Sequence, residues 1–236
     1  MATNRPLLRG IVFDFDGTLA ELNIDFPGMR QGVRDLISNY NVPAGDNALK
    51  DLFVLEMITA GAAMVSQYQP GKEADFIAAA HERIAQIEME AARRGSLFEG
   101  TRGMLEALQT AAIKTGVVTR NCLSAVKALF PDIHQYTHAV ITREQTHYVK
   151  PHPEHLRMML KALEVNTEHA AMVGDHPMDM KIGKDIGVYT IGVLTGHSGR
   201  EELERAGADL ILNAATDIPG ILAQHALPHQ PPDSHR

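Results

Sequence analysis

The chain has 236 residues, a formal net charge of −7, 44 % hydrophobic residues and one cysteine, Cys122. The acidic balance argues against nucleic acid or an anionic membrane as the main partner. No window has the ~18 consecutive apolar residues of a membrane span. The start shows no signal-peptide pattern, and the lone cysteine fits a reducing compartment. We therefore expect a cytoplasmic globular protein with one large domain, or one domain that carries a smaller insertion.

The first predicted strand covers about residues 8–15 and ends in an acidic pair. The apolar run Ile11-Val12-Phe13 leads into Asp14 and Asp16, and Gly17 then breaks the pattern. Such a run is typical of a strand buried on both faces of a parallel sheet. Side chains alternate along a strand, so the two carboxylates start on the same side. They repel each other unless a cation lies between them or one holds a proton. The pair therefore predicts a hard cation such as Mg²⁺ and a different role for each acid.

The next block, about residues 21–97, is predicted to be helical. Apolar residues recur at helical spacing over residues 27–40, 48–67 and 73–94. Gly95 is expected to cap the third helix. The block shows no good strand pattern. We therefore interpret it as an inserted helical bundle.

Strands and helices alternate in the rest of the chain. Strands are predicted at residues 114–119, 137–141, 170–175, 188–193 and 210–212. Helices are predicted at residues 101–112, 124–130, 153–163, 178–186 and 217–224. A further helix is predicted to begin at a capping-box pattern formed by Ser198 and Glu201 and to end at residue 207. Repeated βα units predict the α/β class, with a doubly wound parallel sheet and helices on both faces. The tail, residues 226–236, is expected to be disordered.

Polar side chains follow four of these strands. They are Asp14 and Asp16; Thr119, Arg120 and Asn121; Lys150; and Asp175 with Asp179. The carboxyl ends of parallel strands share one edge of the sheet, so we expect these groups to converge. Together they suit transfer of a phosphoryl group to a carboxylate. A metal and a lysine neutralise phosphate charge, a hydroxyl and N–H groups hold its oxygens, one carboxylate attacks, and a second acid protonates the leaving oxygen.

These motifs resemble those of haloacid dehalogenase superfamily hydrolases, in the phosphoglycolate phosphatase-like branch. The stretch Asp14-Phe15-Asp16-Gly17-Thr18-Leu19 is similar to the family's first signature. Thr119, Lys150 and Gly174-Asp175 with Asp179 are similar to its second, third and fourth. The resemblance implies a Rossmann-like core at residues 1–20 and 98–225, with an α-helical cap inserted at residues 21–97.

The resemblance also implies catalytic roles. Asp14 would be the nucleophile, and Asp16 would be first the general acid and then the base that activates water. Thr119 and Lys150 would also be catalytic residues that hold the phosphate and its charge. Substrate binding would further involve the N–H of Arg120, with either Arg120 or Asn121 facing the phosphate.

The implied metal is Mg²⁺. Asp14, Asp175 and the backbone carbonyl of Asp16 would bind it, and Asp179 would support its waters or Lys150. The histidines near the motifs are expected to be surface residues or local hydrogen-bond partners; they include His147, His152, His155 and His176.

The expected function is Mg²⁺-dependent hydrolysis of a small phosphomonoester, with phosphoglycolate the leading guess, through an aspartyl-phosphate. Two alternatives stay open: a phosphosugar mutase of the same superfamily, and a non-enzymatic phospho-aspartate signalling or regulatory protein. The expected partner is a small phosphorylated metabolite, and the chain is expected to be a monomer or homodimer. Arg30 and Arg34 lie four residues apart on one predicted helix. They could meet an anionic group of the substrate or form a solvated face.

Overall fold

The computed structural model describes residues 7–43 and 46–226, which form two compact units. We call residues up to 21, 97–120 and from 130 onward the sheet unit, and residues 22–96 with 121–129 the helical unit. The tail that was expected to be disordered lies outside the described residues from 227 onward, and residue 226 still belongs to a helix. No helix in the described ranges combines the length and hydropathy that crossing a membrane requires.

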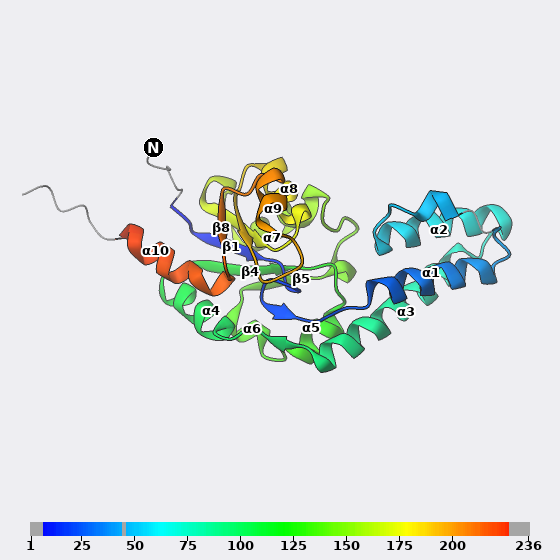
Figure 1. Ribbon diagram of the computed structural model, residues 1–236, viewed down its shortest axis with the longest axis horizontal. Helices are drawn as coiled ribbons and strands as arrows, with labels where there is room; N and C mark the ends of the chain where they lie inside the picture. Colours follow the sequence, from blue (N-terminus) through cyan, green and yellow to red (C-terminus); the bar gives the residue numbers. More distant parts are fainter. Residues whose placement is uncertain (1–6, 44–45, 227–236) are drawn as a thin grey trace, which may run out of the picture. The chain divides into compact units, whose positions relative to one another are not determined.

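In the described part of the chain, the main sheet of the sheet unit has six strands, in the order β5-β4-β1-β6-β7-β8 (Figure 1). Their bounds are β1 Gly10–Phe13, β4 Lys114–Val118, β5 Ala139–Ile141, β6 Ala170–Gly174, β7 Tyr189–Val193 and β8 Leu210–Leu212. Every neighbouring pair is parallel. The predicted α/β class is confirmed.

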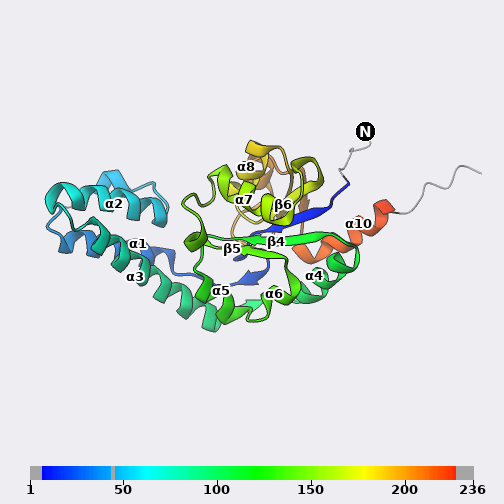
Figure 2. The ribbon, with the colours of Figure 1, turned by 180° about the vertical axis from the view of Figure 1, so that it is seen from behind.

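Helices cover both faces of this sheet. They are α4 Thr101–Thr110, α6 Ile133–Tyr136, α7 Pro153–Leu163, α8 Pro177–Ile186, α9 Arg200–Arg205 and α10 Ile218–Ala226. Helices α7 and α8 pack on one face, while α4, α6 and α10 lie on the other (Figures 1 and 2). Leu156 of α7 and Ile182 of α8 are fully buried against Val12 and Met172 of the central strands. Burial of these apolar side chains holds the central strands in place.

The strand register brings the polar strand ends together. Phe13 of β1 lies opposite Val117 of β4 on one side and Val173 of β6 on the other. The residues that follow these three positions therefore leave the sheet at one edge. That edge is where open parallel sheets place their ligands.

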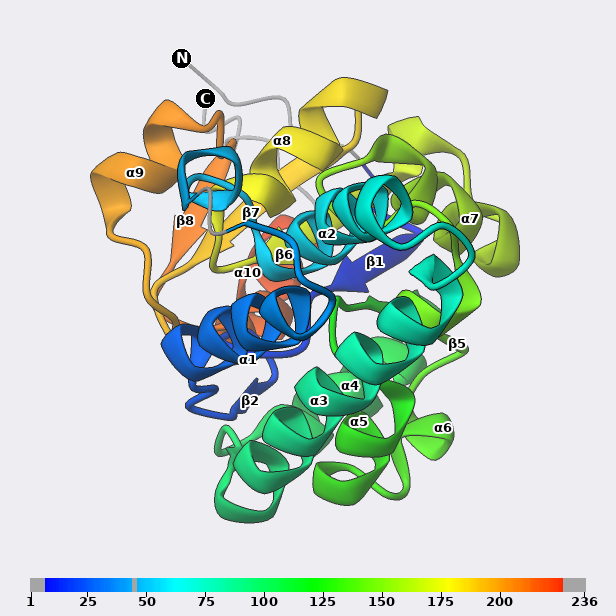
Figure 3. The same ribbon diagram turned by 90° about the vertical axis from the view of Figure 1, so that its right-hand side faces the viewer.

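The helical unit is built from α1 Phe26–Asn39, α2 Val54–Tyr68, α3 Glu73–Arg94 and α5 Leu123–Leu129. The first three pack against one another, and α5 lies along α3 (Figure 3). Cys122, just before α5, is buried, and its N–H donates to Glu88 Oε2 of α3 at 2.9 Å. Cys122 therefore joins the start of α5 to α3.

Three local predictions differ from the structure. The helix predicted at residues 48–67 is instead a 3₁₀ turn, Asp46–Leu49, followed by α2. The Arg30 guanidinium binds the carbonyl oxygens of Leu49, Lys50 and Leu52, so these oxygens are satisfied without a continuous helix.

The other two differences involve short segments. The capping box of Ser198 and Glu201 is absent, because α9 starts one residue later, with Gly199 as its N-cap. Strands β2 Ala20–Glu21 and β3 Ser96–Leu97 pair at the two ends of the helical block. Two residues are too few to show an alternating pattern in the sequence.

The packing of the helical unit yields a stability test. A Cβ on Gly61 of α2 would lie 2.8 Å from both Ile37 Cδ1 and Phe76 Cζ, whereas nothing lies within 4 Å of a Cβ on Gly103 of α4. Gly61→Ala should therefore lower the free energy of unfolding by about 1 kcal/mol or more, because overpacking outweighs the better helix propensity of alanine. Gly103→Ala should raise it by up to about 1 kcal/mol. Urea denaturation of both variants measures this, and a stabilised Gly61→Ala protein would contradict the packing described.

Candidate functional site

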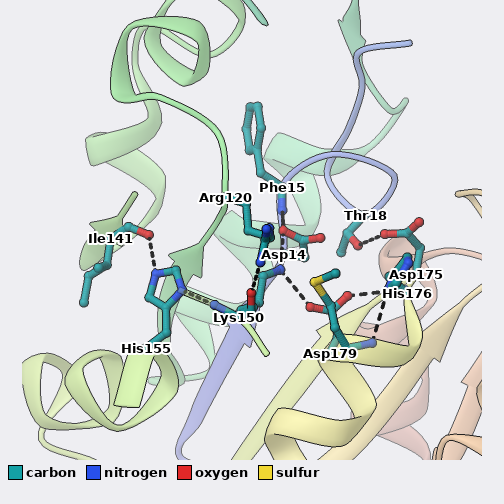
Figure 4. Close-up of polar contacts among 11 residues, drawn as sticks. Asp14, Phe15, Thr18, Arg120, Ile141, Lys150, His155, Asp175, His176 and Asp179 are labelled. Carbon is teal, nitrogen blue, oxygen red and sulfur yellow. Dashed lines mark hydrogen bonds and ion pairs between the residues drawn. The ribbon is translucent and has the colours of Figure 1, made fainter. Parts of the chain in front are cut away.

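Three carboxylates meet at the carboxyl edge of the sheet. Asp14 follows β1, Asp175 follows β6, and Asp179 lies in the first turn of α8. One oxygen of each lies within 4.8 Å of the others, and among the described residues no other group of three metal-ligand side chains comes this close. Figure 4 shows the three side chains with their polar contacts.

Lys150 is the cation of this group. Its Nζ lies 2.6 Å from Asp14 Oδ1 and 2.7 Å from Asp179 Oδ1, and its side chain is only 1 % exposed. Burial by itself lowers the pKa of Lys150, but the carboxylates of Asp14 and Asp179 outweigh it and raise that pKa. Lys150 is therefore an ammonium ion at neutral pH, and it balances one of three neighbouring acids.

The remaining negative charge affects the other two acids. Burial, followed by repulsion from Asp14 and Asp179, raises the pKa of Asp175. Burial also raises the pKa of Asp179; attraction by the Lys150 ammonium lowers that pKa by more than repulsion from Asp14 raises it, but it does not cancel the effect of burial. A divalent cation would relieve this repulsion, and an all-oxygen, carboxylate donor set suits a hard ion. The cluster therefore fits a divalent metal ion.

Asp175 is held between two glycines. Thr18 Oγ1 donates to its Oδ1 at 3.3 Å, and the N–H of His197 donates to its Oδ2 at 3.4 Å. Gly17 has φ +79°, and a Cβ there or on Gly196 would collide with the Asp175 carboxylate. Glycine at both places lets the backbone close around this acid.

Asp179 has two contacts that fix it. Its Oδ1 accepts from Lys150 Nζ, and its Oδ2 accepts from the N–H of His176 at 3.2 Å. The His176 ring in turn accepts from the N–H of Met178, so the two side chains form a capping box at the start of α8. Asp179 therefore both binds the Lys150 ammonium and takes part in capping α8.

Asp14 is the partly exposed member, with 14 % of its side chain accessible. Its Oδ1 accepts from the N–H of Phe15 at 2.7 Å as well as from Lys150, and its own N–H donates to Val173 O. Asp16 is partly exposed and forms an isolated backbone bridge with Ala20. Its side chain is not part of the three-carboxylate group.

Thr119 and Arg120, which follow β4 in the sheet unit, lie at the same edge. Thr119 is buried, and its N–H donates to Ile141 O at 3.1 Å. The Arg120 guanidinium donates to the carbonyl oxygen of Lys150, and the Arg120 carbonyl accepts from Arg143 Nη1 at 3.1 Å. Asn121, the next candidate, is buried and belongs to the helical unit.

Two residues that support this edge were not predicted from the sequence. Arg143 is 7 % exposed and bonds the backbone of Arg120. His155 was expected to be a surface residue or a local hydrogen-bond partner; it accepts from the N–H of Lys150, five residues earlier, and is fully buried. Burial together with nearby Lys150 lowers its pKa to about 4. Neither residue lies in a recognisable motif, so nothing in the sequence distinguishes them.

Comparisons with known proteins all point to one family of hydrolases. Residues 11–193 match the family model for haloacid dehalogenase-like hydrolases. The chain is 27 % identical over 221 residues to the N-acetylmuramic acid 6-phosphate phosphatase of Pseudomonas putida, a match that covers 91 % of this chain and 96 % of that protein. It is 30 % identical over 128 residues to the pyrophosphatase PpaX of Bacillus cereus, which covers 53 % of this chain and 59 % of that protein.

Solved structures show the same fold. A hydrolase from Pseudomonas syringae aligns with a TM-score of 0.66 at 20 % identity, over 93 % of this chain and 100 % of that one. A structure named as a predicted phosphoglycolate phosphatase from Haemophilus somnus aligns with a TM-score of 0.62 at 18 % identity, over 92 % and 98 %. At these identities the likeness concerns the fold.

The raised carboxyl pKa values predict how stability depends on pH in metal-free protein. Protonated Asp175 favours the folded state, and this contribution to the free energy of unfolding is fully present below the ordinary carboxyl pKa of about 4. The contribution is lost as the pH rises through the higher pKa that Asp175 has in the folded protein. Asp175→Asn should remove part of this loss, so the variant should gain stability relative to wild type between pH 5 and pH 8. The exposed substitution Glu106→Gln should not. Urea denaturation across this range measures the slopes, and identical slopes for wild type and Asp175→Asn would refute the raised pKa.

Proposed function

The chain belongs to the haloacid dehalogenase-like hydrolase family, as its motifs predicted, and we propose that it is a Mg²⁺-dependent phosphatase of small phosphomonoesters. The observation that carries this proposal is the Lys150 ammonium held between Asp14 and Asp179 beside Asp175. A carboxylate next to a buried cation and a metal-binding group can receive a phosphoryl group, because the negative charges of both partners are compensated.

The first half-reaction starts at Asp14. Its Oδ1 is engaged by Lys150 and by the N–H of Phe15, so we assign the attack to Oδ2. As the new bond from Oδ2 to phosphorus forms, the ester bond from phosphorus to oxygen breaks. The leaving oxygen takes a proton from Asp16, and an aspartyl-phosphate remains on Asp14.

The second half-reaction restores the enzyme. Asp16, now a carboxylate, takes a proton from water as the water oxygen attacks phosphorus. The bond between Asp14 and phosphorus breaks, and inorganic phosphate leaves. The balance is one ester and one water consumed, with one alcohol and one phosphate released.

Several groups are proposed to hold the phosphate during both steps. Thr119 and the N–H of Arg120 bind its oxygens, and Lys150 offsets its charge. Asp14, Asp175 and the Asp16 carbonyl would hold Mg²⁺, and Asp179 would support it. When bound, the ion withdraws electron density from the phosphate oxygens.

Residues 21–97, which include most of the helical unit, are proposed to form the cap that selects the substrate and excludes water. Similarity to the N-acetylmuramic acid 6-phosphate phosphatase extends over 91 % of the chain, which supports sugar phosphates as candidates alongside phosphoglycolate. Similarity to PpaX extends over only 53 % of the chain, so it is weaker support for pyrophosphate as the substrate. Arg30 is occupied by backbone carbonyls of its own unit, which favours a structural role over substrate binding.

Removal of the proposed nucleophile gives the main test. Asp14→Asn should lower phosphate release with Mg²⁺ by on the order of 10⁴-fold or more, because no carboxylate is left to attack. The exposed substitution Asp185→Asn should leave kcat unchanged. The assay uses phosphoglycolate, N-acetylmuramic acid 6-phosphate, other sugar phosphates, pyrophosphate and an aryl phosphate, ranked by kcat/KM. Activity retained in Asp14→Asn would refute the assigned nucleophile, and a requirement for a sugar bisphosphate would indicate a mutase instead.

Magnesium binding should be visible without turnover. Adding MgCl₂ to metal-free protein at pH 7.5 should raise the free energy of unfolding by about 2.7 kcal/mol at 100 times the Kd, since only the folded state assembles the carboxylates. Asp175→Asn should lose most of this gain, and Glu106→Gln should keep it. Calorimetric melting curves measure the shift, and equal shifts in all three proteins would place the ion elsewhere.

A further inference from the structure

His155 is a fully buried histidine whose two ring nitrogens are both hydrogen-bonded to backbone groups of the site. The N–H of Lys150 donates to His155 Nδ1 at 3.1 Å, and His155 Nε2 lies 3.1 Å from the carbonyl oxygen of Ile141. Figure 4 shows the ring between these two partners. His155 comes from α7, Lys150 from the turn before it, and Ile141 from the end of β5.

The partners determine the state of the ring. A backbone N–H can only donate, so Nδ1 is an acceptor and carries no hydrogen. A carbonyl oxygen can only accept, so Nε2 carries the hydrogen. The ring is neutral at neutral pH because its pKa is about 4.

These hydrogen bonds are part of a closed ring of contacts, which we call the circuit. The carbonyl oxygen of Ile141 also accepts the N–H of Thr119, and Arg120, the next residue, donates its guanidinium to the carbonyl oxygen of Lys150. The circuit therefore runs from Thr119 through Arg120, Lys150, His155 and Ile141 back to Thr119.

Lys150 depends on this circuit for its backbone position. It lies in a turn, outside any helix or strand, and side chains rather than a strand ladder bind its N–H and its carbonyl oxygen. Its Nζ must at the same time reach Asp14 and Asp179 at 2.6 and 2.7 Å. A shift of this backbone would move the ammonium away from one acid or the other.

We propose that His155 is a positioning residue of the phosphatase reaction: its Nδ1 holds the Lys150 N–H, and its Nε2–H anchors that turn to the carbonyl that also receives the Thr119 N–H. The proposal rests on the proposed function for its kinetic consequence. The hydrogen bonds themselves can be tested without turnover.

Two substitutions test the two hydrogen bonds of the His155 ring separately. In His155→Asn, the side-chain oxygen can occupy the place of Nδ1 and accept from Lys150, while the donor to Ile141 is lost. In His155→Gln, the amide nitrogen can take the place of Nε2 and donate to Ile141, while the acceptor for Lys150 is lost. A matched control exists at the other end of the sheet, where His138 Nδ1 accepts from the N–H of Thr115 at 3.1 Å.

The kinetic result expected is a difference between these variants. In His155→Gln, kcat should fall about 10²-fold with KM nearly unchanged, because a misplaced catalytic group slows the chemical step. His155→Asn should recover most of kcat. His138→Gln and His138→Asn should both match wild type. Equal kcat values in the two His155 variants would overturn the proposal.

An NMR measurement of the Lys150 amide separates this proposal from the proposed function. Hydrogen exchange of the amide should be slow in wild type and in His155→Asn, and at least tenfold faster in His155→Gln. If wild type hydrolyses no phosphate ester, the proposed function fails and the exchange rates still decide whether His155 holds Lys150. If neither variant folds, two-bond ¹H–¹⁵N correlations of wild type decide instead, since a ring with its hydrogen on Nδ1 would overturn the proposal.

Discussion

The contact between the Lys150 ammonium and the carboxylates of Asp14 and Asp179 is the interaction on which the rest of the site depends. Removing charges from water is costly, and it is tolerated only where opposite charges and hydrogen bonds surround them. Here one buried ammonium faces three acids whose oxygens lie within 4.8 Å of one another. The group is therefore short of positive charge. Burial and this deficit together raise the pKa of Asp175, and the deficit makes the cluster suitable for a cation.

The sheet supplies the framework for this concentration of charge. β1 lies between β4 and β6, so the ends of three strands deliver side chains to one edge. The elements around them then fix single atoms. α8 is capped by Asp179, the loop at Gly196 closes on Asp175, and His155 holds the turn of Lys150. The apolar core keeps the strands still, and the polar contacts at their ends orient the acids.

Much of this was predictable from local pattern. The apolar run before Asp14 and the βα alternation predicted the parallel sheet, and α3 and α7 have the bounds that their apolar spacing predicted. The convergence of Asp14, Lys150, Asp175 and Asp179 followed from their places at strand ends. Patterns failed where partners are distant in sequence. The Arg30 guanidinium binds a carbonyl oxygen 20 residues away, within the stretch where a helix was predicted. The predicted capping box failed for a local reason, because Gly199 is the N-cap and α9 begins at Arg200.

The sequence by itself determined which strands end in polar residues, to which family the chain belongs, and which kinds of side chain form the site. These depend on local periodicity and on motif spacing. Only the tertiary structure decided which atoms meet. It gave Lys150 two carboxylate partners, turned Arg120 toward a backbone carbonyl and buried His155 between two peptide groups. These contacts join residues on different elements. Their geometry depends on the packing of α7 and α8 against the sheet, which no local stretch of sequence encodes.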